Sequence, residues 1–236
     1  MNNGNSNKSG PAPSGSDFEA ERREMIARQI RGRGIKAARV IEAMEAVPRH
    51  LFVPPKYIAA AYKDTPLPIG EVQTISQPFM VAAMADALLL EGHERALEVG
   101  AGCGYQAAVL SRLAREVIAI EAQPALAAAA RERLDWLGYS NVRVERGDGS
   151  LGWASGAPYE AILVTAAAPA VPQPLVQQLA DGGRLLIPVG PAEHQELFRI
   201  VKKGERTTKE SLYACRFVPL VGRYGWSDKS SGSTPE

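Results

Sequence analysis

Residues 96–104 read Ala-Leu-Glu-Val-Gly-Ala-Gly-Cys-Gly, and this short stretch decides the fold. Its first four residues form a mostly apolar strand, and the rest has a glycine at positions 100, 102 and 104. A helix is predicted over residues 104–114, so the glycines lie where a strand meets its helix. Glycine lets the backbone approach a ligand closely, and open α/β sheets bind their ligands at such junctions. The stretch therefore predicts a ligand-binding turn at the carboxyl edge of a parallel sheet.

The alternation of strand and helix continues on the C-terminal side of this turn. Further strands are predicted at 117–120, 142–144, 161–164 and 185–187, with a helix over 124–137 between the first two. Such alternation predicts an α/β fold with a doubly wound, mostly parallel sheet. After Gly190, apolar stretches at 197–201 and 212–218 flank a polar turn and predict an antiparallel C-terminal hairpin at one edge of the sheet.

The N-terminal side of the turn has a different pattern. Residues 1–16 are polar and rich in Gly and Pro, so we expect a disordered tail. Two helices are predicted next, one from near Ser16 and one after Gly34 that Pro48 ends, and they form an N-terminal helical appendage. Residues 51–77 are rich in Pro and Gly and predict a long ordered or functional loop.

Composition and charge exclude several classes of function. The 27 basic and 26 acidic residues leave a net charge of +1, which gives the protein no general attraction to nucleic acid or membrane. Cys103 and Cys215, the two cysteines, match no metal-ligand spacing, so we expect free thiols, a reducing compartment and no metal site. No secretory signal or membrane-spanning apolar run is evident, and we expect a cytoplasmic protein.

Three strand ends carry the residue types of a nucleotide site. Glu98 lies at the end of the first strand, Glu121 closes the next, and Gly147-Asp148-Gly149 follows the third. A carboxylate about 20 residues after the glycine turn can accept hydrogen bonds from ribose hydroxyls. A dinucleotide fingerprint would need a third glycine at position 105, which is Tyr105, so NAD is disfavoured. Each feature alone could be a structural turn, but three successive strand ends predict one shared ligand.

The pattern acid-x-Gly-x-Gly-x-Gly resembles motif I of the Rossmann-like S-adenosylmethionine-dependent methyltransferases. This resemblance implies that S-adenosylmethionine is the cofactor, with its methionine part at the glycine turn, its ribose at Glu121 and its adenine beside residues 148 and 149. Cys103 lies within the turn, but no histidine is near it in sequence. We therefore interpret Cys103 as a small filler residue rather than a nucleophile.

A second resemblance, to the protein-L-isoaspartate O-methyltransferases, narrows the class. It rests first on Leu-Pro-Ile-Gly at 67–70 and Gln-Thr-Ile-Ser-Gln-Pro at 73–78. Shorter matches are Val-Pro-Arg at 47–49, Val-Thr-Ala-Ala-Ala-Pro at 164–169 and Arg-Phe-Val-Pro-Leu at 216–220. The resemblance covers residues 19–222. It implies a repair enzyme that transfers a methyl group from S-adenosylmethionine to the α-carboxylate of L-isoaspartyl residues in damaged proteins and peptides.

The family resemblance also implies roles for individual residues. Ser76 corresponds to the catalytic serine and is expected to contact the substrate. The implied cofactor-binding residues are Thr74, Ile75, Glu98, Gly100, Ala101, Gly102, Gly104, Glu121, Asp148 and Gly149, and the further implied substrate-binding residues are Ala167, Ala168, Pro169, Phe217, Val218 and Pro219.

The motifs divide the chain into four parts. We expect a disordered tail at 1–16, helices and a substrate and cofactor loop at 17–77, an S-adenosylmethionine-binding methyltransferase domain at 78–222 and a flexible tail at 223–236.

The chemistry of the implied substrate agrees with the residues present. An isoaspartyl α-carboxylate has a pKa of about 3.5 to 4, so it is already ionised at neutral pH and needs no general base. The chain has three histidines, and none stands in an evident catalytic triad. Ser76 has a structural alternative, because it could cap the helix that begins at Pro78. The two roles of Ser76 can coexist.

Two other functions stay open at this point. One is a methyltransferase for a small molecule or RNA that shares only the cofactor sheet, and the stretch at 67–78 argues against it. The other is an S-adenosylmethionine-binding module without catalysis, although the acidic residues and Ser76 are all present. Residues 165–169 lack the Asp/Asn-Pro-Pro-aromatic motif of DNA amino-methyltransferases. Neither cysteine follows a proline, as the nucleophile of cytosine-C5 methyltransferases does. We expect a monomer whose partners are damaged proteins, without nucleic acid or membrane.

Overall fold

The computed structural model describes residues 15–227, apart from the side chains of Gly15 and Ser16. Residues 1–14 of the predicted N-terminal tail and residues 228–236 of the predicted C-terminal tail lie outside the described residues. Within residues 15–227, no helix is both long enough and apolar enough to cross a membrane.

A seven-stranded sheet in the order β5-β4-β3-β6-β7-β8-β9 forms the centre of the protein. The four pairings from β5 to β7 are parallel, whereas β8 pairs antiparallel with both β7 and β9. The strands are β3 (Arg95–Val99), β4 (Glu116–Glu121), β5 (Val142–Arg146), β6 (Tyr159–Val164), β7 (Leu179–Val189), β8 (Gln195–Lys203) and β9 (Arg206–Cys215). The predicted doubly wound, mostly parallel sheet with an antiparallel C-terminal hairpin is confirmed.

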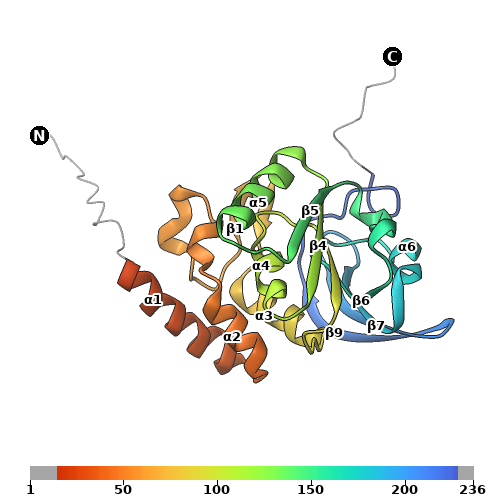
Figure 1. Ribbon diagram of the computed structural model, residues 1–236, viewed down its shortest axis with the longest axis horizontal. Helices are drawn as coiled ribbons and strands as arrows, with labels where there is room; N and C mark the ends of the chain where they lie inside the picture. Colours follow the sequence, from red (N-terminus) through yellow and green to blue (C-terminus); the bar gives the residue numbers. More distant parts are fainter. Residues whose placement is uncertain (1–14, 228–236) are drawn as a thin grey trace, which may run out of the picture.

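Helices cover both faces of this sheet. One face carries α3 (Pro78–Ala87), α4 (Tyr105–Ser111) and α5 (Pro124–Trp136), and the other carries the short α6 (Gln173–Gln177) (Figure 1). Along β3, Ala96 packs in the apolar core on the first side, while Leu97 and Val99 pack on the second. Successive side chains of a strand point to opposite faces. Because both faces are covered, the central parallel strands β3, β4 and β6 are largely apolar, which made them visible in the sequence, whereas β5 carries three charged residues.

The N-terminal appendage packs against the layer that contains α3 and α4. Its elements are α1 (Gly15–Glu24), η1 (Met25–Ile30), η2 (Arg31–Arg33), α2 (Ala38–Ala46), η3 (Arg49–Phe52) and η4 (Pro55–Ala60). Met25, Ile30 and Met44 are fully buried in the same core as these two helices. The two predicted helices are confirmed, and Gly34, with φ of 97°, ends the first helical run.

The predicted loop at 51–77 contains a β-hairpin that sequence reasoning missed. Strands β1 (Leu67–Gly70) and β2 (Gln73–Ile75) pair antiparallel. Glu71 and Val72 join them with φ values of 48° and 56°. A turn with two positive φ values fits the twist of hairpin strands, but it is usually built from Asn and Gly. The Glu-Val pair carries no such signal, so the hairpin was not predicted.

Strand β9 begins earlier than the predicted strand at 212–218. Residues 206–211 are polar and exposed, because β9 is the last strand at its edge of the sheet. Polar residues protect an exposed edge from pairing with other chains, but they hide the strand from a prediction based on apolar residues. Residues after Cys215 leave the sheet, and Val218 reaches the cleft described below.

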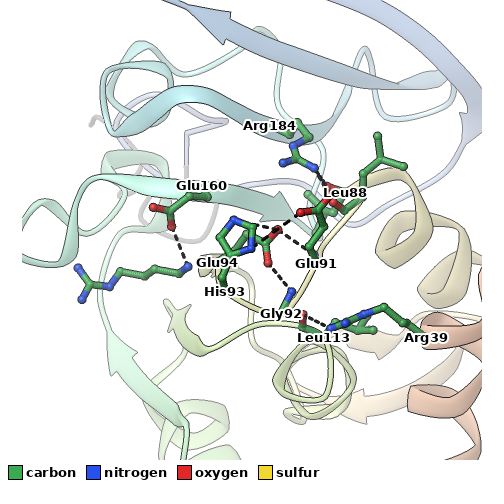
Figure 2. Close-up of polar contacts among 11 residues, drawn as sticks. Arg39, Leu88, Glu91, Gly92, His93, Glu94, Leu113, Glu160 and Arg184 are labelled. Atoms are coloured by element: carbon green, nitrogen blue, oxygen red, sulfur yellow. Dashed lines mark hydrogen bonds and ion pairs between the residues drawn. The ribbon is translucent and has the colours of Figure 1, made fainter.

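A polar network holds the loop between α3 and β3 at the end of the sheet opposite the glycine turn (Figure 2). The buried carboxylate of Glu94 accepts hydrogen bonds from the backbone N–H groups of Glu91 and Gly92, both at 2.8 Å. Arg184 donates to the carbonyl oxygen of Leu88 at 2.8 Å. Burial raises the pKa of Glu94, but the backbone N–H donors together outweigh burial and hold the pKa below its ordinary value.

We predict that Glu94→Gln lowers the free energy of unfolding at neutral pH by roughly 1.5 to 3 kcal/mol, as is typical for hydrogen bonds to a charged group. The pKa of Glu94 is lower in the folded than in the unfolded chain. Its stabilisation is therefore complete above the unfolded value of about 4.3 and is lost as the pH falls through the folded value. Urea unfolding should show a difference from wild type that shrinks on acidification. Glu91→Gln, whose side chain is 79% exposed, is the control, and an equal loss there would contradict the prediction.

Candidate active site

A cleft opens at the carboxyl ends of β3, β4 and β6. Its walls come from three segments that are far apart in the sequence: residues 73–76 around the end of β2, residues 98–103 of the glycine turn, and residues 218–221 after β9. Glu121 and Thr165, at or just after two other strand ends, complete it. The cleft lies where the sequence predicted a ligand site.

Backbone rather than side chain forms much of the cleft wall at the glycine turn. A Cβ on Gly100 would lie 2.5 Å from Oγ1 of Thr165, which donates a 2.7 Å hydrogen bond to the carbonyl oxygen of Gly100. On the neighbouring loop, a Cβ on Gly149 would lie 2.4 Å from Cγ1 of Val99. Only glycine allows these close approaches, so strands β3, β5 and β6 end against one another with little side-chain bulk between them.

The carboxylate of Glu121 is held in place by two backbone amides. Its Oε2 accepts from the N–H of Gly102 at 2.8 Å, and its Oε1 accepts from the N–H of Gln123 at 2.9 Å. The side chain is 7% exposed and lines the cleft. A carboxylate oxygen can accept more than one hydrogen bond, so Glu121 can still accept from a pair of hydroxyl groups.

Glu98 lines the same cleft in the opposite condition. It is fully buried, and neither oxygen has a hydrogen-bond partner among the described residues. Burial, and after it the charge of Glu121, raise the pKa of Glu98 well above its ordinary range. A buried charge is normally paired. An ionised Glu98 therefore needs a positive partner, which a cationic ligand could supply.

These residues fit S-adenosylmethionine, which carries an ammonium group, a sulfonium group and a ribose diol. The unpartnered Glu98 carboxylate can meet a cation, and the oriented Glu121 carboxylate can meet the diol. For metal ions, in contrast, the described residues contain no group of three or more His, Cys, Asp or Glu side chains that could hold one.

Ser76 is half-buried and lines the same cleft as the glycine turn. The position that caps α3 belongs to Gln77, and no side chain forms a capping hydrogen bond there. The alternative role of Ser76 as the helix cap is therefore wrong. Pro78 occupies the first turn of α3, where a proline lacks no needed hydrogen bond.

Cys103 is buried within the glycine turn, and Arg133 donates to its carbonyl oxygen at 2.9 Å. Burial raises the pKa of the Cys103 thiol, which keeps it protonated and poorly nucleophilic. Cys103 and Cys215 are both free thiols, as predicted.

The structure brings most of the predicted site residues into one wall. Those that line the cleft are Thr74, Ile75, Ser76, Glu98, Gly100, Ala101, Gly102, Glu121, Gly149, Val218 and Pro219. Those that do not line it are Gly104, Asp148, Ala167, Ala168, Pro169 and Phe217. Their direct contacts with a ligand stay predictions.

The residues outside the wall have identifiable structural surroundings. Gly104 begins α4 with a φ of 89°, close beneath Leu134 of α5. Ala167 and Ala168 are fully buried and form backbone bridges to Pro219 and Val189. Both side chains are enclosed by the protein.

The Asp148 carboxylate is already engaged. It accepts from the N–H and the hydroxyl group of Ser150 and from the N–H of Arg223. Residues 223–227, which we expected to be flexible, thus form an ordered turn against Asp148.

Sequence reasoning missed several residues of the cleft wall, among them Gln73, Gln106, Gln123, Thr165, Leu220 and Val221. Thr165 and Leu220 lie inside stretches that had already been matched, so the strand-end position of Thr165 could have identified it. Gln73 also lies inside a matched stretch, at 73–78, whereas Gln106 and Gln123 carry no pattern of their own.

Comparisons with known proteins identify the family of the chain. Residues 20–225 match the family described as protein-L-isoaspartate(D-aspartate) O-methyltransferase. A protein-L-isoaspartate O-methyltransferase 2 of Geotalea uraniireducens is 55% identical over 213 residues, which cover 89% of this chain and 98% of the relative. A protein-L-isoaspartate O-methyltransferase of Methanoregula boonei is 53% identical over 208 residues, covering 88% of this chain and 96% of the relative.

Solved structures give the same result. One described as a protein-L-isoaspartate O-methyltransferase aligns with a TM-score of 0.80 at 28% identity, covering 86% of this chain and 67% of that one. A Plasmodium falciparum protein described as a putative member, in complex with S-adenosyl-L-homocysteine, aligns with a TM-score of 0.73 at 25% identity, covering 86% of this chain and 98% of that one.

We predict that Glu98→Gln stabilises the ligand-free protein at neutral and alkaline pH. The pKa of Glu98 is higher in the folded than in the unfolded chain. The fold therefore loses stability as the pH rises from the unfolded value of about 4.3 through the folded value. Gln cannot ionise, so the urea midpoint of the variant should exceed that of wild type by an amount that grows with pH. The exposed Glu132→Gln on α5 is the control, and a pH-independent difference for Glu98→Gln would count against the assignment.

Proposed function

The chain belongs to the protein-L-isoaspartate(D-aspartate) O-methyltransferase family, and on that premise we propose that its cleft is the active site for methyl transfer from S-adenosylmethionine to the α-carboxylate of L-isoaspartyl residues. The observation that carries the proposal is that Ser76, the glycine turn, Glu98 and Glu121 all line one cleft. The substrates are damaged proteins and peptides.

Three parts of the cleft wall would hold the cofactor. The glycine turn, with the unpartnered carboxylate of Glu98, suits the methionine end and its ammonium group. Glu121 suits the ribose, because Gly102 and Gln123 fix its carboxylate. Gly149, which has no side chain, leaves room for a flat ring. When bound, S-adenosylmethionine supplies an electrophilic methyl group.

The residues around the cleft suit a substrate that needs no deprotonation. An α-carboxylate of pKa about 3.5 is an anion at neutral pH. The described part of the cleft wall contains no histidine. His50 bonds to Tyr62, at 2.7 Å, and His93 lies near Glu94 at the other end of β3. The protein's contribution is therefore to orient the carboxylate and exclude water, not to accept a proton.

Ser76 is the residue that we assign to the substrate carboxylate. Its hydroxyl group can donate one hydrogen bond to an anionic oxygen. The β1–β2 hairpin places it, since Ile75 is buried beside it and pairs with Leu67. Thr74 and Ile75 then face the cofactor side of the cleft.

Both isoaspartate and aspartate carry an ionised carboxylate, so selection between them must come from contacts between the cleft wall and the substrate backbone on either side of that residue. Val218 and Pro219 line the cleft, and the Ala167 N–H donates to the Val218 carbonyl oxygen at 2.8 Å. This wall suits an extended peptide. An isoaspartyl peptide is longer by one backbone carbon, which moves its α-carboxylate relative to that wall.

We further propose that the protein acts as a cytoplasmic monomer without nucleic-acid or membrane partners. The net charge of +1 and the two free thiols support this proposal. We also propose the division of the chain into a helical and loop part at 17–77 and a cofactor domain at 78–222, on the basis of the sequence motifs in each part.

We predict methylation of peptides that contain L-isoaspartate and negligible methylation of the matched L-aspartyl peptides. The measurement is transfer of a labelled methyl group, followed by mild base, since the ester of an isoaspartyl residue is labile. A base-labile label on the isoaspartyl peptide alone is the expected result. Equal labelling of both peptides, or stable labelling of RNA or a small metabolite, would overturn the proposal.

We predict that Ser76→Ala lowers the turnover rate by roughly 10- to 100-fold, the range expected for one lost hydrogen bond to a charged group. Cofactor affinity, measured by calorimetry, should change little, because Ser76 is assigned to the carboxylate. The exposed Ser155→Ala, outside the cleft wall, is the matched control. A fall in activity that merely follows a fall in melting temperature would remove Ser76 from this role.

A further inference from the structure

Residues 220–226 form a closed turn after the last strand, which we call the C-terminal turn. Its two ends meet, because the N–H of Trp226 donates to the carbonyl oxygen of Leu220 at 2.7 Å and the N–H of Gly222 donates to that of Trp226 at 3.2 Å. Val221 and Trp226 also form a backbone bridge. The turn is therefore a defined structure rather than a frayed end.

One side of the C-terminal turn holds the wall that we assign to the substrate. The carbonyl oxygen of Ala167 accepts two hydrogen bonds, one from the N–H of Leu220 at 2.8 Å and one from the indole Nε1 of Trp226 at 3.0 Å. Ala167 also bridges to Pro219, which lines the cleft. Trp226 thus fixes the substrate wall from behind, without lining the cleft itself.

The other side of the C-terminal turn holds the loop after β5, which we assign to the adenine end of the cofactor. The N–H of Arg223 donates to Oδ2 of Asp148 at 2.8 Å, and the N–H of Tyr224 donates to Oγ of Ser150 at 3.0 Å. Ser150 is fully buried. Gly149, between the two acceptors, lines the cleft.

Two glycines make these contacts possible. A Cβ on Gly222 would lie 2.0 Å from Oδ1 of Asp148, and a Cβ on Gly225 would lie 2.1 Å from the carbonyl oxygen of Leu220. The spacing of glycines in Gly222-Arg223-Tyr224-Gly225-Trp226 is therefore fitted to a close approach on both sides.

We propose that the C-terminal turn is a positioning element that ties the substrate wall to the cofactor loop, with Trp226 and Ser150 as its positioning residues. This inference rests on the proposed function of the cleft. It also gives Asp148 a role through the turn, because its carboxylate is occupied by Arg223 and Ser150. Removing the hydrogen bond of either Trp226 or Ser150 should make the wall at Val218 and Pro219 less rigid.

The test is Trp226→Phe in the full chain, which keeps a six-membered aromatic ring and removes the five-membered ring of the indole together with its N–H. We expect the KM for an isoaspartyl peptide, at saturating S-adenosylmethionine, to rise roughly threefold to tenfold, as for one neutral hydrogen bond. The cofactor Kd should change by less than about twofold. Trp153→Phe is the matched control, because the indole N–H of Trp153 has no hydrogen-bond partner among the described residues, and its KM should equal that of wild type.

A double-mutant cycle decides whether the effect passes through the turn. Ser150→Ala alone should also raise the peptide KM, and the double variant should be little worse than the more affected single variant, because both release the same element. The inference is overturned if Trp226→Phe behaves as Trp153→Phe does, if it weakens cofactor as much as peptide, or if the two effects multiply. A wild-type protein that methylates no isoaspartyl peptide would instead overturn the proposed function.

Discussion

The hydrogen bond from the N–H of Gly102 to the carboxylate of Glu121 joins the ends of two adjacent parallel strands, and the site depends on it. The turn that donates it has glycine at positions 100, 102 and 104, and a Cβ on Gly100 would lie 2.5 Å from Oγ1 of Thr165. The contact fixes the Glu121 carboxylate, whereas the Glu98 carboxylate in the same cleft has no hydrogen-bond partner among the described residues. In this way one backbone conformation sets both the shape and the charge of the cleft.

Two glutamates four residues apart at β3 have different roles, one in stability and one in the candidate site. Glu94 immediately precedes β3 and Glu98 lies within it, and both side chains are fully buried. Backbone N–H groups satisfy Glu94 and lower its pKa, so it stabilises the fold. No described residue satisfies Glu98, and burial raises its pKa. An unsatisfied buried carboxylate weakens the ligand-free fold, and such conflicts are characteristic of functional sites.

Much of this could be predicted from the sequence, for a physical reason. Strands such as 96–99 and 161–164 are buried on both faces and read as apolar runs. Positions 100, 102 and 104 favour glycine because each has a positive φ and little room for a Cβ against a neighbouring side chain. The prediction failed where the structure depends on polar residues or on distant partners. Glu71 and Val72 form a turn that their residue types do not indicate. The C-terminal turn depends on Asp148, which is about 75 residues away in the chain.

The central claim is that the ligand completes the charge of the cleft, and calorimetry tests it most directly. S-adenosylmethionine is titrated into the protein at about pH 6, where its ammonium group is protonated, in two buffers with different ionisation enthalpies. The account predicts proton release, seen as a buffer-dependent binding enthalpy, because Glu98 ionises as the cationic ligand arrives, and Glu98→Gln should abolish that dependence. Equal enthalpies in both buffers for the wild type, or an unchanged dependence in the variant, would contradict it.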